Sequence, residues 1–105
     1  MSKIKTNKVN IAQIGVGYWG PNLLRNLVGN ESCEVKTVVD LSEERRAFVR
    51  GLYPSLKVSN EIVDIINDNN IEAVIIATPV TTHFNLVMQC LEAGKHILVE
   101  KPMAT

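Results

Sequence analysis

The chain has 105 residues, of which 46% are hydrophobic and 21% charged, and its formal net charge is zero. This length suits one compact domain, and the apolar content excludes a disordered or collagen-like chain. Eleven basic residues balance eleven acidic ones, which argues against a nucleic-acid or membrane-surface partner. The longest apolar run, Ala73–Ala77, is far too short to span a bilayer.

The two cysteines, Cys33 and Cys90, lie far apart in the chain and outside any CxxC motif. We interpret them as free thiols of a cytoplasmic protein, because the cytoplasm keeps thiols reduced. Polar residues interrupt the stretch that follows the first lysines, so no signal peptide is expected. No metal site is expected either.

The first third of the chain reads as strand, helix, strand. Residues 8–14 (KVNIAQI) alternate in polarity and then meet glycines, which predicts a strand that ends in a turn. The apolar residues of 19–28 share one helical face, and Gly29 and Asn30 are typical of a helix end. Residues 35–40 (VKTVVD) predict a second strand.

The middle of the chain repeats this rhythm. Ser42 is a typical N-cap, with two glutamates following in the first turn, and the helix is expected to end near Leu52 before Tyr53-Pro54. A weak strand is predicted at 56–58. Asn60 is then expected to cap a third helix, which ends in the polar turn 67–70.

The last third contains the strongest strand signal. Residues 71–78 (IEAVIIAT) are continuous and rich in β-branched side chains, as in a strand buried on both faces. Thr81 or Thr82 is expected to cap the next helix, and Gly94 to end it. Residues 96–100 (HILVE) predict a fifth strand, with His96 at the head of a buried strand in a structural role.

Strands that alternate with helices at this spacing predict a parallel sheet with helices on both faces. We expect a Rossmann-type α/β fold in one domain, residues 1–105, with five strands in the order 3-2-1-4-5. Ligands of such sheets bind at the carboxyl ends of the strands, beside the switch point between the first and fourth strands.

A GxGxxG motif (Gly15, Gly17, Gly20) lies between the first strand and the first helix. Gly15 is expected to allow the tight turn, Gly17 to let a pyrophosphate approach the backbone, and Gly20 to let helix and strand pack closely. The helix N-terminus would supply N–H groups and partial positive charge to the phosphates. The alternative is a purely structural glycine turn.

Asp40 ends the second strand, twenty positions after the last glycine of the motif. A carboxylate there accepts both adenosine-ribose hydroxyls and repels a 2′-phosphate, which favours NAD over NADP. The alternative is a helix-capping aspartate. Arg45 and Arg46 follow one turn into the next helix. A basic residue near this loop could accommodate a 2′-phosphate, but we interpret the two arginines as part of a solvated face.

Two further candidate places follow the fourth and fifth strands. Thr78-Pro79 closes the fourth strand, and His83 near the next helix start is a candidate for a ribose or phosphate contact, or else a local capping partner. Glu100-Lys101 follows the fifth strand, where a lysine would lie near the nicotinamide and assist hydride transfer. Taken without context, this segment reads as an exposed loop.

Together, these segments are more specific than any one of them. IGVGYWGPNLLRNL, VVDLSEER, ATPVTTH and LEAGKHILVEKPMA resemble the N-terminal domain of the Gfo/Idh/MocA (glucose–fructose oxidoreductase / inositol dehydrogenase) family of NAD(P)-dependent sugar dehydrogenases. The resemblance covers roughly residues 9–105. The GYWGPN variant is similar to members that act on nucleotide-linked amino sugars.

The resemblance implies roles for individual residues. The three glycines match the phosphate-binding glycines, Tyr18 and Trp19 are in the same loop beside the cofactor, and Asp40 matches the ribose-binding acid of NAD-preferring members. Thr78, Pro79 and His83 match the turn that lines the nicotinamide half of the cleft, with Glu100 nearby. Lys101 matches the catalytic lysine that faces substrate and nicotinamide, and a cis peptide bond is expected before Pro102.

Family enzymes continue into a second domain that binds the sugar and usually builds the oligomer, and this chain contains no counterpart of it. We therefore expect a truncated NAD-binding domain of an oxidoreductase that transfers hydride between a sugar or nucleotide-sugar alcohol and nicotinamide. This domain alone is expected to bind cofactor without turnover, and its uncovered sheet surface to favour self-association. A non-catalytic, redox-sensing NAD module and an S-adenosylmethionine-dependent methyltransferase remain as alternatives. The sugar substrate and the reaction direction stay open.

Overall fold

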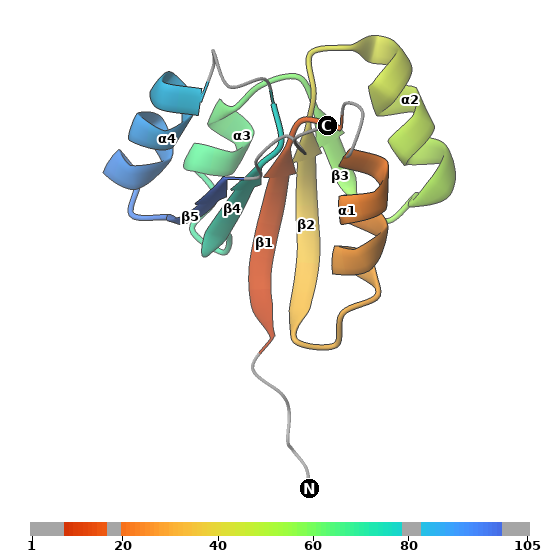
Figure 1. Ribbon diagram of the computed structural model, residues 1–105, viewed down its shortest axis with the longest axis horizontal. Coiled ribbons are helices and arrows are strands. Elements are labelled where there is room, and N and C mark those ends of the chain that lie inside the picture. The colour runs from red at the N-terminus through yellow and green to blue at the C-terminus, as the bar shows by residue number, and fades with distance from the viewer. Residues whose placement is uncertain (1–7, 17–19, 79–82, 100–105) are drawn as a thin grey trace, which may run out of the picture.

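The computed structural model describes residues 8–16, 20–78 and 83–99. In this part of the chain, a five-stranded parallel sheet has the order β3-β2-β1-β4-β5 (Figure 1). The predicted Rossmann-type order 3-2-1-4-5 is confirmed. The strands are β1 (Val9–Ile14), β2 (Cys33–Val39), β3 (Lys57–Ser59), β4 (Ala73–Ile76) and β5 (His96–Val99). The helices are α1 (Gly20–Val28), α2 (Glu43–Leu52), α3 (Val63–Ile66) and α4 (His83–Glu92).

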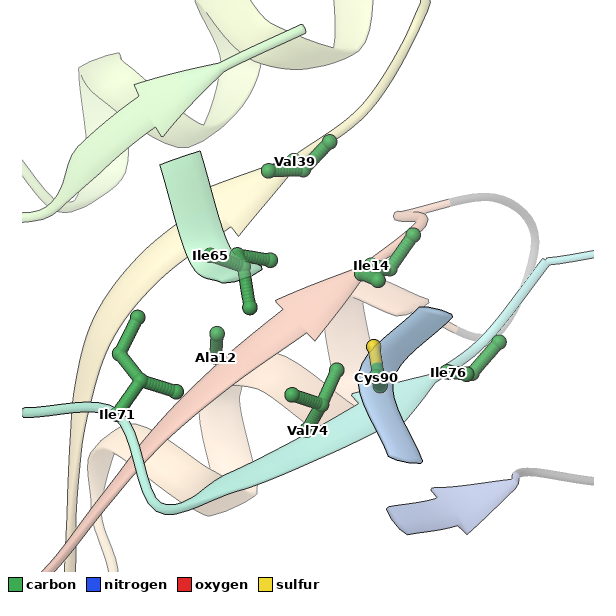
Figure 2. Packing of buried hydrophobic residues seen from close by; sticks show 8 residues of the cluster. All are labelled: Ala12, Ile14, Val39, Ile65, Ile71, Val74, Ile76 and Cys90. Atoms are coloured by element: carbon green, nitrogen blue, oxygen red, sulfur yellow. The ribbon is translucent and has the colours of Figure 1, made fainter. Parts of the chain in front are cut away.

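Helices cover both faces of the sheet, as predicted (Figure 1). Successive side chains of a strand point to opposite faces, so each central strand contributes to two cores. On one face, α1 and α2 pack against the strands through a cluster that contains Ile11, Leu24, Val38, Val49 and Ile75. On the other face, α3 and α4 pack through the cluster drawn in Figure 2, which contains Ala12, Ile14, Val39, Ile65, Ile71, Val74, Ile76 and Cys90.

The strand β1 lies at the centre of this arrangement. It pairs with β2 on one side and with β4 on the other, and all residues from Ile11 to Ile14 are buried. The chain therefore adds β2 and β3 on one side of β1 and then crosses to the other side to add β4 and β5. This switch point is where a parallel sheet opens a crevice at its carboxyl edge.

Local end signals account for the start of α2 and the end of α4. Ser42 caps α2, because its side-chain oxygen accepts a hydrogen bond from the N–H of Arg45 at 3.3 Å. Gly94 follows α4 with φ +82°, a left-handed conformation that glycine adopts without strain. Both ends agree with the sequence analysis. The predicted caps Thr81 and Thr82 and the predicted helix start at residue 19 lie outside the described residues.

The third helix differs from the prediction. It has only four residues, and Ile62, not Asn60, stands at its N-cap position without a side-chain bond. Ser59 takes over the local turn, since its hydroxyl accepts the N–H of Glu61 at 2.9 Å. The prediction of an Asn60 cap is therefore wrong.

The fifth strand is an edge strand and is not buried on both faces. Ile97 and Val99 pack on the α3–α4 cluster, whereas His96 is exposed and Leu98 is 59% exposed. The prediction that His96 heads a buried strand is wrong, since α1 and α2 pack farther along the sheet, on β1, β2 and their neighbours. The exposed Leu98 agrees with the expected uncovered surface, and self-association stays a prediction.

A buried lysine ties the end of α4 to the loop before β4. Lys95 is only 7% exposed, and its ammonium donates to the carbonyl oxygens of Asp68 at 2.6 Å and Ile71 at 2.9 Å. Burial raises the pKa of the neighbouring Cys90 thiol, and the Lys95 charge partly offsets that rise. Cys90 is thus a protonated, apolar-like core residue. Both cysteines are free.

Within the described ranges, no helix is long and apolar enough to cross a bilayer.

Replacing Lys95 by methionine should lower the free energy of unfolding by about 2 kcal/mol, because two backbone carbonyls lose a charged donor. Urea denaturation followed by circular dichroism measures this. Lys36→Met is the matched control, since Lys36 is 39% exposed in its side chain and makes one surface ion pair with Glu34, worth about 0.5 kcal/mol. An equal decrease in the free energy of unfolding in the two variants would show that the buried hydrogen bonds of Lys95 stabilise the protein no more than a surface ion pair does.

Candidate cofactor-binding cleft

A cleft of about 670 Å³ opens at the carboxyl ends of β1, β2 and β4. This volume lies within the range of about 300–1,000 Å³ that is usual for small-molecule sites. Its walls come from the ends of three strands, the start of α2, the β3–α3 connection and the start of α4. The lining residues include Gly15, Asp40, Leu41, Ser42, Arg45, Asn60, Ile62, Thr78 and Leu86.

A second hollow, of about 570 Å³, is lined by Lys57 and the turn 67–70. Lys57 begins β3 and the turn precedes β4, so this hollow is at the amino edge of the sheet. Ligands of parallel sheets bind at the opposite edge. The described residues contain no group of three or more His, Cys, Asp or Glu side chains placed to hold a metal ion.

Gly15 makes the turn at the end of β1 possible. Its φ is +94°, and a Cβ there would lie 2.7 Å from Thr78 Cγ2 and 2.8 Å from the Ala77 carbonyl oxygen. Its N–H donates to the Val39 carbonyl at 2.8 Å. The turn therefore fits against the ends of both β2 and β4, and only glycine fits there.

Gly20 is the first residue of α1 and lies close to this turn. A Cβ on Gly20 would lie 3.2 Å from the Gly15 carbonyl oxygen and 3.3 Å from the side-chain nitrogen of Gln13. Close packing between α1 and β1, which the motif predicted for Gly20, is therefore confirmed. Gly17, Tyr18 and Trp19 lie outside the described residues.

Asp40 connects the glycine turn to the start of α2. The residue is almost buried, at 9% exposure. Oδ2 accepts the backbone N–H of Val16 at 2.7 Å, and Oδ1 accepts the N–H of Ser42 at 2.8 Å. Ser42 and not Asp40 occupies the N-cap of α2, but the bond to the Ser42 N–H gives Asp40 a supporting role at the start of this helix.

Residues 9–105 match the family described as GFO_IDH_MocA, the "Oxidoreductase family, NAD-binding Rossmann fold". The chain belongs to this family. The predicted resemblance is confirmed, and residues 9–105 correspond to the NAD-binding Rossmann fold of that family.

Individual Gfo/Idh/MocA relatives show how far the similarity extends. An inositol 2-dehydrogenase of Rhodococcus erythropolis is 37% identical to this chain. The match covers 92% of this chain and 28% of the dehydrogenase. A scyllo-inositol 2-dehydrogenase (NADP(+)) of Bacillus subtilis is 33% identical over 96% of the chain and 27% of its own length. The crystal structure of an NAD-binding protein from Listeria innocua is 31% identical, with a TM-score of 0.82 over 92% of this chain and 27% of that one. The chain thus spans less than a third of the length of these relatives.

The two arginines after Asp40 have different environments. Arg46 is partly buried, and its Nη1 donates to the carbonyl oxygens of Asp40 at 2.9 Å and Leu41 at 3.0 Å. The interpretation of Arg46 as a solvated residue is wrong, because it holds the corner between β2 and α2. Arg45 is exposed and lines the cleft.

Of the other Gfo/Idh/MocA positions singled out in the sequence, two can be placed. Thr78 is partly buried and lines the cleft beside Gly15. His83 is the first residue of α4. Pro79, Glu100 and Lys101, and the expected cis bond before Pro102, lie outside the described residues.

Sequence reasoning missed several contributors to the site, among them Gln13, Leu41 and Asn60. Gln13 is fully buried, and its amide nitrogen donates to the carbonyl oxygens of Gly15 and Gly20. Leu41 and Asn60 line the cleft, and Leu41 is 86% exposed. The signal for Gln13 was its polar side chain between the apolar residues Ala12 and Ile14 of a predicted strand. Leu41 and Asn60 line the same cleft because β3 lies beside β2, where the Asp40 N–H donates to the Ser59 carbonyl at 3.0 Å.

Replacing Gly15 by alanine should destabilise the protein by more than about 2 kcal/mol, because the left-handed backbone and the close β4 contact leave no room for a methyl group. Gly51→Ala in α2 is the matched control. A Cβ at Gly51 meets nothing within 4 Å, so this change should stabilise the protein by about 0.5–1 kcal/mol. Thermal unfolding of both variants measures the difference, and a neutral Gly15→Ala would contradict the turn geometry.

Proposed function

We propose that this cleft binds the adenosine half of NAD(H), in an oxidoreductase that transfers hydride between a sugar or nucleotide-sugar secondary alcohol and nicotinamide. The observation that carries the proposal is the Asp40 carboxylate, held by two backbone N–H groups on the wall of a 670 Å³ cleft. Membership of the Gfo/Idh/MocA family supports the same cofactor class.

The bonding of Asp40 fits a ribose diol. An ionised carboxylate has about four acceptor positions, and the backbone takes one on each oxygen. Each oxygen therefore keeps acceptor capacity for one ribose hydroxyl. A 2′-phosphate would replace a hydroxyl donor with negative charge facing Asp40, so this carboxylate favours NAD(H) over NADP(H). The exposed Arg45 lines the same cleft, and titration with both cofactors measures whether the Asp40 charge outweighs it.

The glycine turn and α1 fit the pyrophosphate. The first N–H groups of a helix lack intrahelical partners and carry partial positive charge. Pro21 is compatible with this position because a first-turn residue has no hydrogen bond to lose. Gly15 and Gly20 let the turn and the start of α1 pack closely on the ends of β1 and β4, and we assign Gly17, Tyr18 and Trp19 to contacts of this loop with the cofactor.

The remaining assignments concern the reacting end of the cofactor, which would accept or donate hydride at nicotinamide C4 when bound. Thr78, Pro79 and His83 are proposed to line that half of the cleft, together with Glu100. Lys101 is proposed to hold or move the proton of the substrate hydroxyl. These roles follow the family motif. Because the chain spans under a third of its relatives' length, we propose that this domain alone binds cofactor without turnover.

Calorimetric titration with NADH, NADPH and S-adenosylmethionine tests the cofactor assignment. NADH should bind at least tenfold more tightly than NADPH, equivalent to about 1.4 kcal/mol, and S-adenosylmethionine should not bind. Equal affinities for NADH and NADPH would overturn the role of Asp40. Preferential binding of S-adenosylmethionine would overturn the cofactor class.

Replacing Asp40 by asparagine should reduce the preference for NADH over NADPH, because the repelling charge is removed. The matched control is Asp68→Asn, since Asp68 accepts a similar local backbone bond from Asn70 at 2.9 Å but lies in the turn before β4. The control should keep the wild-type ratio of the two dissociation constants. If Asp40→Asn keeps it as well, the carboxylate does not discriminate between the cofactors.

A further inference from the structure

We propose that Gln13 is a positioning residue of the dinucleotide site, which holds the glycine turn and the start of α1 in the geometry that receives the cofactor. The inference rests on the proposed NAD(H) binding and concerns a residue outside the GxGxxG motif. Gln13 would act through the backbone, without touching the ligand.

The environment of Gln13 is unusual for a glutamine. It is fully buried, in a strand whose neighbouring residues Ile11, Ala12 and Ile14 are apolar. Its Oε1 has no hydrogen-bond partner among the described residues. Burying an unpaired amide oxygen costs free energy, so the contribution of Gln13 comes from its amide nitrogen.

That nitrogen holds both ends of the glycine segment. Nε2 donates to the Gly15 carbonyl at 2.8 Å and to the Gly20 carbonyl at 3.3 Å. Both partners are acceptors, so the amide orientation is dictated by its contacts. One side chain of β1 therefore joins the residue that starts the turn to the residue that starts α1.

The Gly15–Val16 peptide group is held at its two ends. Its carbonyl oxygen accepts from Gln13, and its N–H donates to Oδ2 of Asp40 at 2.7 Å. Gln13 thus keeps the carbonyl directed into the protein and away from an anionic ligand. Through the same peptide group, Gln13 also fixes Oδ2 of Asp40, the carboxylate that we propose binds ribose. Because catalytic and binding groups need such precise support, loss of this bond should affect the ligand more than the fold.

Two substitutions at Gln13 test the inference in the full-length protein. Gln13→Met keeps the side-chain length and removes the donors, and we expect NADH to bind at least tenfold more weakly. Gln13→Glu should lose a similar factor at pH 8 and recover part of it at pH 6. Burial raises the pKa of the introduced carboxyl, and only its protonated form donates to a carbonyl. Gln89→Met is the matched control, because Gln89 is exposed on α4 and should leave affinity unchanged.

Amide hydrogen exchange at Val16, measured by NMR without ligand, gives an independent readout. In Gln13→Met, this N–H should exchange at least tenfold faster than in the wild type, while the core amide of Val74 keeps its protection. A Gln13→Met protein with wild-type affinity for NADH and unchanged exchange at Val16 would overturn the inference alone. Failure of the wild-type protein to bind NADH would overturn the proposed function and this inference together.

Discussion

The hydrogen bond between the Asp40 carboxylate and the Val16 N–H joins segments that are 24 residues apart. It connects the turn after β1 to the end of β2, and the second carboxylate oxygen connects both to the start of α2. A charged acceptor makes such bonds short and strong. The rest of the cleft depends on this contact, because the glycine turn, the β2–α2 corner and the proposed ribose site share one carboxylate.

The sheet makes this contact possible. β1 lies between β2 and β4, so its carboxyl end meets two strands and the turn that follows must pass close to both. Gly15 allows the backbone to bend there, and its N–H is paired with the Val39 carbonyl. Arg46 fixes the adjacent corner through two carbonyl oxygens. Backbone groups at the edge of the cleft are therefore held in fixed orientations, an arrangement that favours anion binding.

Polar side chains in the interior hold the loops in position, while apolar residues hold the sheet. Lys95 donates to two carbonyls before β4, and Gln13 donates to two carbonyls around the glycine turn. Each pays a desolvation cost that an apolar residue would avoid. Both bonds act on irregular backbone, which has few partners of its own in the sheet. For the Gfo/Idh/MocA relatives of this chain, such residues are worth inspecting alongside the recognised motif.

Local sequence determined much of this protein. Apolar periodicity placed β1, α1, β2, α2, α4 and β5 to within a few residues, Ser42 and Gly94 marked helix ends, and the spacing from GxGxxG to Asp40 indicated the site. These signals act over one or two turns of chain, so they are readable without coordinates. The tertiary structure alone decided that α3 is one short turn, that His96 is exposed on an edge strand, and that Arg46 and Gln13 bind loop carbonyls. Those outcomes depend on which distant strand or helix lies next to each side chain, and that neighbour is set by the packing of the whole sheet.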